Sequence, residues 1–175
     1  MTSIKLKTPL DPKQISNLKT GDIVSLSGTI IGARDAAHKR MILAIKNGEK
    51  LPLDLKNATI FYLGPSPTPP GKVCGSIGPT TSARMDSYAE PLLKVGLKAM
   101  IGKGKRSNKL KEILKKYGAI YFVAPGGVAA YLSKKVKKID AIAYQDLGHE
   151  TIYSLFVEDF PLIVAYDIFG GDIFK

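Results

Sequence analysis

Short apolar runs alternate along the chain with segments in which apolar residues recur every three or four positions. The first pattern is typical of β-strands and the second of amphipathic helices, so the alternation predicts an α/β domain. An open, doubly wound sheet is the simplest arrangement of such units. Strands are expected at residues 22–33, 59–64, 99–103, 119–125, 140–144 and 161–167.

A short helix is predicted near the start of the chain. Asp11 has a side chain that suits a helix cap, and Pro12 suits the first helical turn. Ile15 and Leu18 supply a buried stripe, and Gly21 can close the helix in a left-handed conformation.

Two longer helices follow from the same signals. Asp35 can cap a helix that ends at Gly48. Ser107 can cap another within the basic segment 103–116. The apolar residues of that segment recur at helical spacing, as on a surface helix, at Leu110, Ile113 and Leu114.

Segment 64–72 contains four prolines, which preclude a regular helix or a central strand. Strand and helix signals resume after it. We therefore expect a loop inside one domain that covers residues 1–175, and not a linker between two domains.

The composition supports a packed globular chain. The 175 residues are 45% hydrophobic and 23% charged, which argues against a disordered or fibrous protein. No apolar run approaches the roughly 18 residues of a membrane span, and segment 1–13 lacks a signal-peptide core, so a cytoplasmic location is expected. Cys74 is the only cysteine, and one cysteine cannot form an internal disulfide, a zinc site or an iron–sulfur site.

The net charge of +11 makes nucleic acid a candidate partner. Much of the excess lies in segments 103–116 and 134–138, where aromatic residues are not interleaved. A solvated helix face is the plainer interpretation. The alternatives are a patch that meets an acidic partner subunit and a nucleic-acid surface.

Segment 75–88 carries the strongest chemical signal. Thr80 and Thr81 follow a Gly-Pro break and can cap a helix whose first turn contains Arg84. Backbone N–H groups at a helix start attract anions, and an arginine adds a two-pronged donor for a carboxylate or phosphate. The plainer alternative is that Arg84 pairs with Asp86 or another acid.

Two further cations follow expected strands. Arg34 comes after the strand that ends at residue 33, and Lys103 ends the run 99–103. Ligands of α/β folds bind beyond the carboxyl ends of strands. If these strand ends lie together, Arg34, Arg84 and Lys103 converge on a small molecule with two carboxylates.

Other polar residues are expected to have structural roles. His38 and His149 are expected at structural or surface positions, and Cys74 as a small buried group. Asp35 is expected to cap a helix or to orient Arg34, and Asp86 to brace Arg84. Glu150 and Asp159 are expected to be structural or to lie at a subunit interface.

Four motifs together resemble one enzyme family: ARDAAHKR (33–40), GPTTSARMDSY (78–88), MIGKGKRS (100–107) and VEDFP (157–161). The chain is similar to the β subunit of class I, iron–sulfur-dependent fumarate hydratase, a family shared with L-tartrate dehydratase β subunits. The resemblance covers nearly the whole chain. It implies a swivelling β/β/α domain with a mixed sheet covered by helices, in place of the open sheet.

The resemblance also implies a half-enzyme. A partner α subunit would hold a four-iron four-sulfur cluster through three cysteines, and this chain would supply no metal ligand. The reaction implied is reversible hydration of fumarate to L-malate. An L-tartrate dehydratase subunit and a non-catalytic nucleic-acid-binding module are the alternatives.

Carried over by position, Arg34, Arg84 and Lys103 match residues that bind the substrate's carboxylates. Thr80 matches a threonine that transfers a proton. The segment between Arg84 and Lys103 is one residue shorter than in relatives, so Lys105 is the alternative to Lys103.

Overall fold

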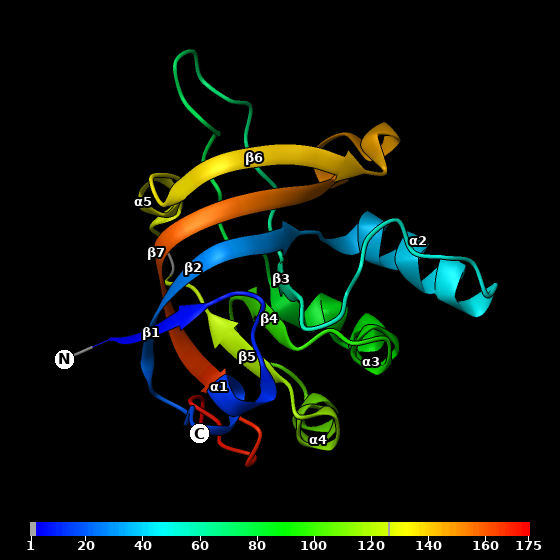
Figure 1. Cartoon of the computed structure of the whole chain (residues 1–175), viewed down its shortest axis with the longest axis vertical. Helices are drawn as coiled ribbons and strands as arrows, with labels where there is room; N and C mark the ends of the chain where they lie inside the picture. The colour runs from blue at the N-terminus through cyan, green and yellow to red at the C-terminus, as the bar shows by residue number, and fades with distance from the viewer. Residues whose placement is uncertain (1–2, 126) are drawn as a thin grey trace.

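The computed structural model of the protein describes residues 3–125 and 127–175 (Figure 1). Met1 and Thr2, which open the segment expected to lack a signal peptide, lie outside these ranges. Within the described ranges, no helix is both long enough and apolar enough to cross a membrane.

The strands of the described chain form one mixed sheet in the order β1-β2-β3-β4-β5-β7-β6, and β2 also pairs with β7. This extra pairing closes β2, β3, β4, β5 and β7 into a ring (Figure 1). The strands are β1 (Ile4–Lys7), β2 (Ile23–Gly32), β3 (Thr59–Phe61), β4 (Ala99–Gly102), β5 (Ile120–Val123), β6 (Val136–Ala143) and β7 (Ile152–Tyr166).

The closed, mixed sheet confirms the β/β/α expectation and shows that the open sheet was wrong. Strand β7 causes the difference, because it runs antiparallel to β2, β5 and β6 and joins β2 to β5. The expected strand 161–167 corresponds only to its second half. Ser154, Glu158 and Asp159 interrupt the apolar pattern of the first half and conceal the full strand.

Strand β6 begins earlier than expected, inside the basic segment 134–138. It lies at the edge of the sheet, next to β7 alone. Lysines are common on edge strands because they discourage pairing with another chain. The bases that concealed this strand in the sequence are therefore consistent with its place in the fold.

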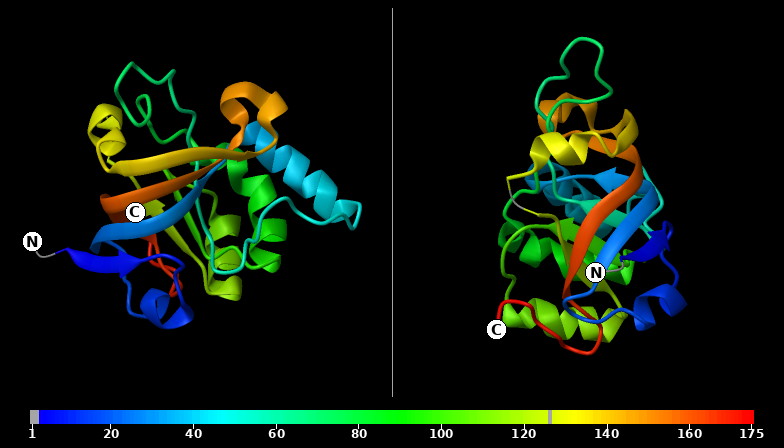
Figure 2. Two further views of the ribbon diagram at one scale, coloured as in Figure 1. Left: turned by 45° about the horizontal axis from the view of Figure 1, so that its top comes forward. Right: turned by 90° about the vertical axis from the view of Figure 1, so that its left-hand side faces the viewer.

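The longer helices cover one side of the ring. Helix α3 contacts both α2 and α4, and the three lie side by side in all views (Figures 1 and 2). The helices are α1 (Pro12–Ser16), α2 (Asp35–Lys46), α3 (Asp86–Lys94), α4 (Asn108–Tyr117) and α5 (Ala129–Ser133), with 3₁₀ turns η1 (Ser82–Met85) and η2 (Gln145–Glu150).

Strand alternation divides the buried residues into two cores. Phe61 and Ile101 belong to the core inside the ring, with Phe122 and Phe160. Their strand neighbours Ile60 and Met100 belong to the second core, beneath α2, α3 and α4. Successive side chains of a strand point to opposite faces, so each strand of the ring serves both cores.

The predicted start of α1 is confirmed. Asp11 Oδ1 accepts the Gln14 N–H at 2.8 Å, and Gln14 Oε1 accepts the Asp11 N–H at 3.0 Å, which completes a capping box. Pro12 opens the helix. Ile15 and Leu18 are buried, as their spacing predicted.

The predicted basic helix is also confirmed as α4. Ser107 Oγ accepts the Leu110 N–H at 3.2 Å, and Gly118 ends the helix in a left-handed conformation. The expected apolar stripe is buried: Leu110, Ile113 and Leu114.

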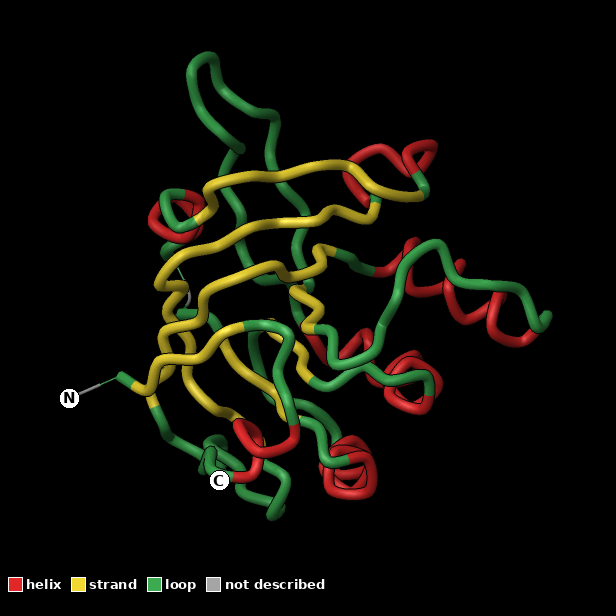
Figure 3. Tube along the Cα trace, in the orientation of Figure 1, coloured by secondary structure: helices red, strands yellow, loops and turns green. Residues whose placement is uncertain are grey.

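The predicted loop 64–72 contains no helix or strand, and it belongs to an excursion of the chain that projects beyond the edge of the sheet (Figure 3). The Ser66 N–H donates to Ser76 O at 3.0 Å, and the Ser76 N–H donates to Ser66 Oγ at 2.9 Å. Cys74 is buried at the loop base, as expected, and its Sγ lies 3.9 Å from Ser133 O.

The two histidines occupy contrasting positions. His149 is exposed, whereas His38 of α2 is 1% exposed and packs edge-on against Tyr62. His38 Nδ1 lies 2.8 Å from Arg34 O, and because a carbonyl only accepts, this nitrogen carries the hydrogen. Desolvation lowers the pKa of His38 to about 4 from 6.5. His38 is therefore a neutral structural residue at the start of α2.

We predict that His38 makes the protein less stable in mild acid. Its folded pKa lies below its unfolded value, so the unfolded chain takes up the proton first as pH falls from 6.5 toward 4. The free energy of unfolding should fall by about 2 kcal/mol between pH 7 and pH 5 through this group. Urea denaturation at both pH values measures it. His38→Gln should lose this pH dependence, and His149→Gln should retain it. If the free energy of unfolding changed equally with pH in the wild type and both variants, His38 would not be the group responsible.

Candidate active site

The candidate site lies where three parallel strands end. Strands β2, β3 and β4 are neighbours, pairing through Gly32 with Phe61 and through Phe61 with Ile101. Their carboxyl ends therefore lie side by side. Arg34 follows β2, and Lys103 follows β4, so the arrangement assumed for these two cations exists in the fold.

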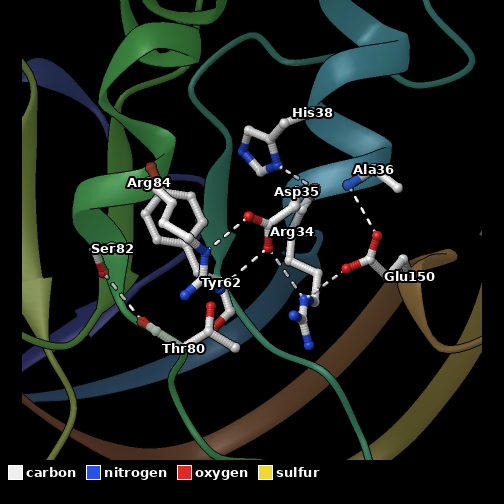
Figure 4. Close-up of polar contacts among 9 residues, drawn as sticks. All are labelled: Arg34, Asp35, Ala36, His38, Tyr62, Thr80, Ser82, Arg84 and Glu150. Atoms are coloured by element: carbon white, nitrogen blue, oxygen red, sulfur yellow. Dashed lines mark hydrogen bonds and ion pairs between the residues drawn. The ribbon is translucent and has the colours of Figure 1, made fainter.

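Asp35 joins two of the candidate arginines (Figure 4). Its Oδ1 accepts the Arg84 Nε–H at 2.9 Å, and its Oδ2 lies 3.2 Å from Arg84 Nη2 and 3.3 Å from Arg34 Nε. The hydrogen bond from Arg84 lowers the pKa of Asp35, so this carboxylate stays ionised. Asp35 orients arginines, as one interpretation held; the other was wrong, because Asp35 is the first residue of α2 and does not cap it.

The cap of α2 comes instead from Glu150, at the end of η2. Glu150 Oε2 accepts the Ala36 N–H at 3.0 Å, and Oε1 lies 2.9 Å from Arg34 Nε (Figure 4). No local sequence signal predicts this contact, because the two residues are 114 positions apart. Asp159, the other acid of open role, joins β7 to β2 through Ser25 and Ser27.

Gly64 leaves the space that the Arg34 side chain occupies. A Cβ atom on residue 64 would lie 2.7 Å from Arg34 Nη1, closer than real Cβ contacts allow. This glycine opens the proline loop directly after β3. Its position there was visible in the sequence, but its role depends on the contact with Arg34.

Thr80 lies beside the same strand end. Its N–H donates to Tyr62 O at 2.8 Å, and its Oγ1 is 3.4 Å from the same oxygen. The cap predicted for Thr80 and Thr81 is wrong, since η1 begins at Ser82 and Thr81 makes no side-chain cap bond. The reason is that Thr80 continues an extended segment that pairs with the end of β3.

Arg84 belongs to η1, immediately before α3, and not to the first turn of an α-helix as expected. Its side chain is 47% exposed. The expected pairing with an acid exists, but the acid is Asp35 and not Asp86.

Ser82 fixes the segment of Thr80 to the segment of Lys103. Its N–H donates to Lys103 O at 3.2 Å, and its Oγ accepts the Lys103 N–H at 3.0 Å. Gly102 permits this approach, because a Cβ there would collide with Ser82 Oγ. Lys103 also forms a bridge with Thr81, whereas Lys105 lies beyond a turn at Gly104. The backbone of Lys103 is thus joined directly to the segment of Thr80, and the choice between Lys103 and Lys105 stays a prediction.

Asp86, the first residue of α3, holds the segment that follows β4. It was expected to brace Arg84, but it pairs with Arg106 Nε, and its Oδ2 accepts the Ser107 N–H at 2.9 Å. The Arg106 side chain is completely buried, and its Cζ lies 5.3 and 4.9 Å from the ring centroids of Tyr62 and Tyr121. Sequence reasoning missed Arg106, because a base within a basic run resembles a solvated residue.

The resulting surface suits a small dianion. Arg34 contacts Asp35 and Glu150 through Nε, Arg84 contacts Asp35 through Nε and Nη2, and Lys103 is exposed. In the close-up, both guanidinium groups lie on the side of Asp35 where Thr80 is drawn (Figure 4). Arginine binds carboxylates through paired N–H groups, so this surface can take two carboxylates next to a hydroxyl.

The described residues do not fit an iron–sulfur cluster. Among them, no three His, Cys, Asp or Glu side chains lie together as metal ligands. Cys74 is buried, and burial raises the pKa of its thiol, which disfavours the thiolate that binds metal.

Fumarate hydratases and tartrate dehydratase β subunits are among the proteins similar to this chain. The chain is 41% identical over 164 residues to fumarate hydratase class I, aerobic, of Escherichia coli, which covers 93% of this chain and 30% of that protein. It is 43% identical over 172 residues to a putative L(+)-tartrate dehydratase subunit beta of Methanocaldococcus jannaschii, covering 95% and 88%. It is 31% identical over 173 residues to L(+)-tartrate dehydratase subunit beta of Escherichia coli, covering 96% and 85%.

The chain thus spans about a third of the fumarate hydratases that it matches, and most of each tartrate dehydratase β subunit. It matches the family described as Fumarase C-terminus over residues 1–175. The family match and these identities show that this protein belongs to the Fumarase C-terminus family.

Proposed function

We propose that the chain is the β subunit of a two-subunit hydro-lyase that interconverts fumarate and L-malate. One observation carries the proposal: Arg34 and Arg84 both contact Asp35 at the strand ends where Thr80 lies, and the backbone of Lys103 bridges to Thr81. Three cations would match two carboxylates, and the Thr80 hydroxyl would transfer the proton.

The exposure of this surface supports a partner α subunit. Small-molecule sites bury about 70–90% of their ligand's surface. Arg84 is 47% exposed and Lys103 is also exposed, so a second protein surface would have to cover the substrate. Because the described residues do not fit a cluster, the four-iron four-sulfur cluster implied by the resemblance is assigned to that partner.

The chemistry proposed for this chain is carboxylate binding and proton transfer. Removal of a proton from the carbon next to a carboxylate builds negative charge on that carboxylate. Arg34, Arg84 and Lys103 lower the barrier if they bind this charge more tightly than the ground state. Thr80 Oγ1 takes or returns the proton, assisted by a carboxylate of the partner, because a hydroxyl alone is a weak base.

L-tartrate is the second candidate substrate. The two tartrate dehydratase β subunits support it, since the chain covers most of their length. Tartrate has the same two carboxylates as malate and one more hydroxyl group. Both substrates therefore belong in every assay.

Nucleic-acid binding has less support. Four of the seven bases in segment 103–116 are paired with acids. Such pairing leaves less charge for phosphate contacts. Salt-sensitive binding of mixed nucleic acid by the chain would revive this alternative.

We predict that hydratase activity requires both subunits. The test is anaerobic hydration of fumarate, and dehydration of malate and of L-tartrate, by each chain separately and by the reconstituted pair. This chain alone should be inactive, because its described residues offer no cluster ligands. Turnover by the isolated chain would overturn the half-enzyme assignment.

We predict that Arg84→Lys lowers kcat/KM by about 10²-fold, equivalent to roughly 2.7 kcal/mol of transition-state stabilisation. Lysine keeps the charge but loses the planar fork that binds Asp35 and a substrate carboxylate together. Steady-state kinetics of the reconstituted pair measure the effect. Arg40→Lys is the matched control, because Arg40 pairs equally well with Asp146 but outside the site. Similar kinetics for the Arg84 variant and the control would give Arg84 a structural role.

We predict that Thr80→Val abolishes exchange of the substrate's C3 proton with solvent, whereas Thr80→Ser retains part of it. The Val variant should stay folded, because the Thr80 hydroxyl caps no helix and its bond to Tyr62 O is long, at 3.4 Å. Its loss should cost less than about 1 kcal/mol. Exchange is followed in deuterated buffer and stability by urea denaturation. Rapid exchange in the Val variant would remove Thr80 from the proton-transfer role.

A further inference from the structure

We propose that Glu150 is a positioning residue for substrate binding, which acts by orienting Arg34. This inference rests on the proposed function of Arg34 as a carboxylate-binding residue. It adds a residue from the β6–β7 connection to a site otherwise built at the ends of β2, β3 and β4.

Both oxygens of Glu150 have a defined partner. Oε1 lies 2.9 Å from Arg34 Nε, and Oε2 accepts the Ala36 N–H at 3.0 Å. The backbone bond fixes the carboxylate at the start of α2, and the second oxygen then faces the guanidinium. The side chain is 24% exposed, so solvent competes only weakly for these contacts.

The consequence for Arg34 is a fixed guanidinium plane. Glu150 and Asp35 both contact Nε, which leaves the terminal Nη1 and Nη2 groups for a substrate carboxylate. Gly64 leaves room for Nη1, since a Cβ atom on residue 64 would lie 2.7 Å from it. Without Glu150, Arg34 would keep only the longer 3.3 Å contact to Asp35, a carboxylate that Arg84 also binds.

A second contact holds the η2 turn on α2 and provides a matched control. Arg40 donates two hydrogen bonds to Asp146, at 2.8 and 2.7 Å. Asp146 and Glu150 are therefore acids of the same turn, each paired with an arginine at or near α2. Of these two ion pairs, only the one between Glu150 and Arg34 involves a residue of the candidate site.

The test compares Glu150→Gln with Asp146→Asn in the reconstituted pair. Glutamine can still accept the Ala36 N–H, but it loses the charge that holds Arg34. We expect kcat/KM for the active dicarboxylate to fall tenfold or more in the Glu150 variant, on the order of effects seen when positioning contacts to metal or substrate groups are lost. The Asp146 variant should stay within about twofold of the wild type, as surface substitutions usually do.

A double-mutant cycle identifies the route of the effect. If Glu150 acts through Arg34, then Glu150→Gln should have little further effect in an Arg34→Ala background. Independent, multiplicative losses would overturn the proposal. Equal losses in the Asp146 and Glu150 variants would also overturn it, because they would indicate that attachment of the turn is what matters. Wild-type kinetics in Glu150→Gln would do the same.

A spectroscopic measurement separates this inference from the proposed function. In the full chain without its partner, Glu150→Gln should shift the Arg34 Nε–H NMR signal and speed its exchange with solvent, because Arg34 Nε loses an ion pair and keeps only its hydrogen bond to Asp35. A wild-type pair that turns over neither fumarate nor tartrate would refute the proposed function. An Arg34 signal that is the same in the wild type and in Glu150→Gln would refute the positioning role, whatever the activity.

Discussion

The pairing of β2 with β7 is the constraint on which the rest of the arrangement depends. These strands pair antiparallel from Ile23 and Ile163 to Gly32 and Tyr153, and the pairing closes the ring. Strand number, tilt and stagger are linked in a closed sheet, so the ends of β2, β3 and β4 have fixed relative positions. Closure of the sheet therefore fixes the backbone positions of Arg34 and Lys103, independently of their side-chain contacts.

Carboxylates then determine how the arginine side chains of the site are oriented. Arg34 and Arg84 both contact Asp35, and the negative charge of Asp35 offsets the repulsion between the two guanidinium groups. Arg106 is buried and needs an acid beside it, which Asp86 supplies. Asp35 contacts Nε of both Arg34 and Arg84, and Glu150 contacts Nε of Arg34. The carboxylates that balance the positive charge therefore also orient the guanidinium groups.

Features with local signals could be predicted from the sequence. The caps at Asp11 and Ser107 depend on residues three positions away, and both are confirmed. The contact of Glu150 with α2 and the burial of Arg106 depend on segments that only the closed sheet brings together. For the same reason, Asp35 and Asp86 were assigned to neighbours in sequence, whereas their main partners come from other elements. The roles of Thr80, Arg34, Arg84 and Lys103 remain predictions.

The proposed division of labour also bears on substrate choice. Fumarate, malate and tartrate share two carboxylates, and the three cations of this chain would bind what they share. A hydrophobic or charged contact discriminates poorly against an added hydroxyl, whereas a buried polar group left unpaired discriminates strongly. Discrimination therefore requires a polar group that faces the central carbons. In this chain Thr80 is the proposed residue closest to that role, and its hydroxyl would serve proton transfer with either substrate. Under the proposed function, the group that selects between fumarate and tartrate is thus expected on the surface that covers the site, and specificity would lie with the partner subunit.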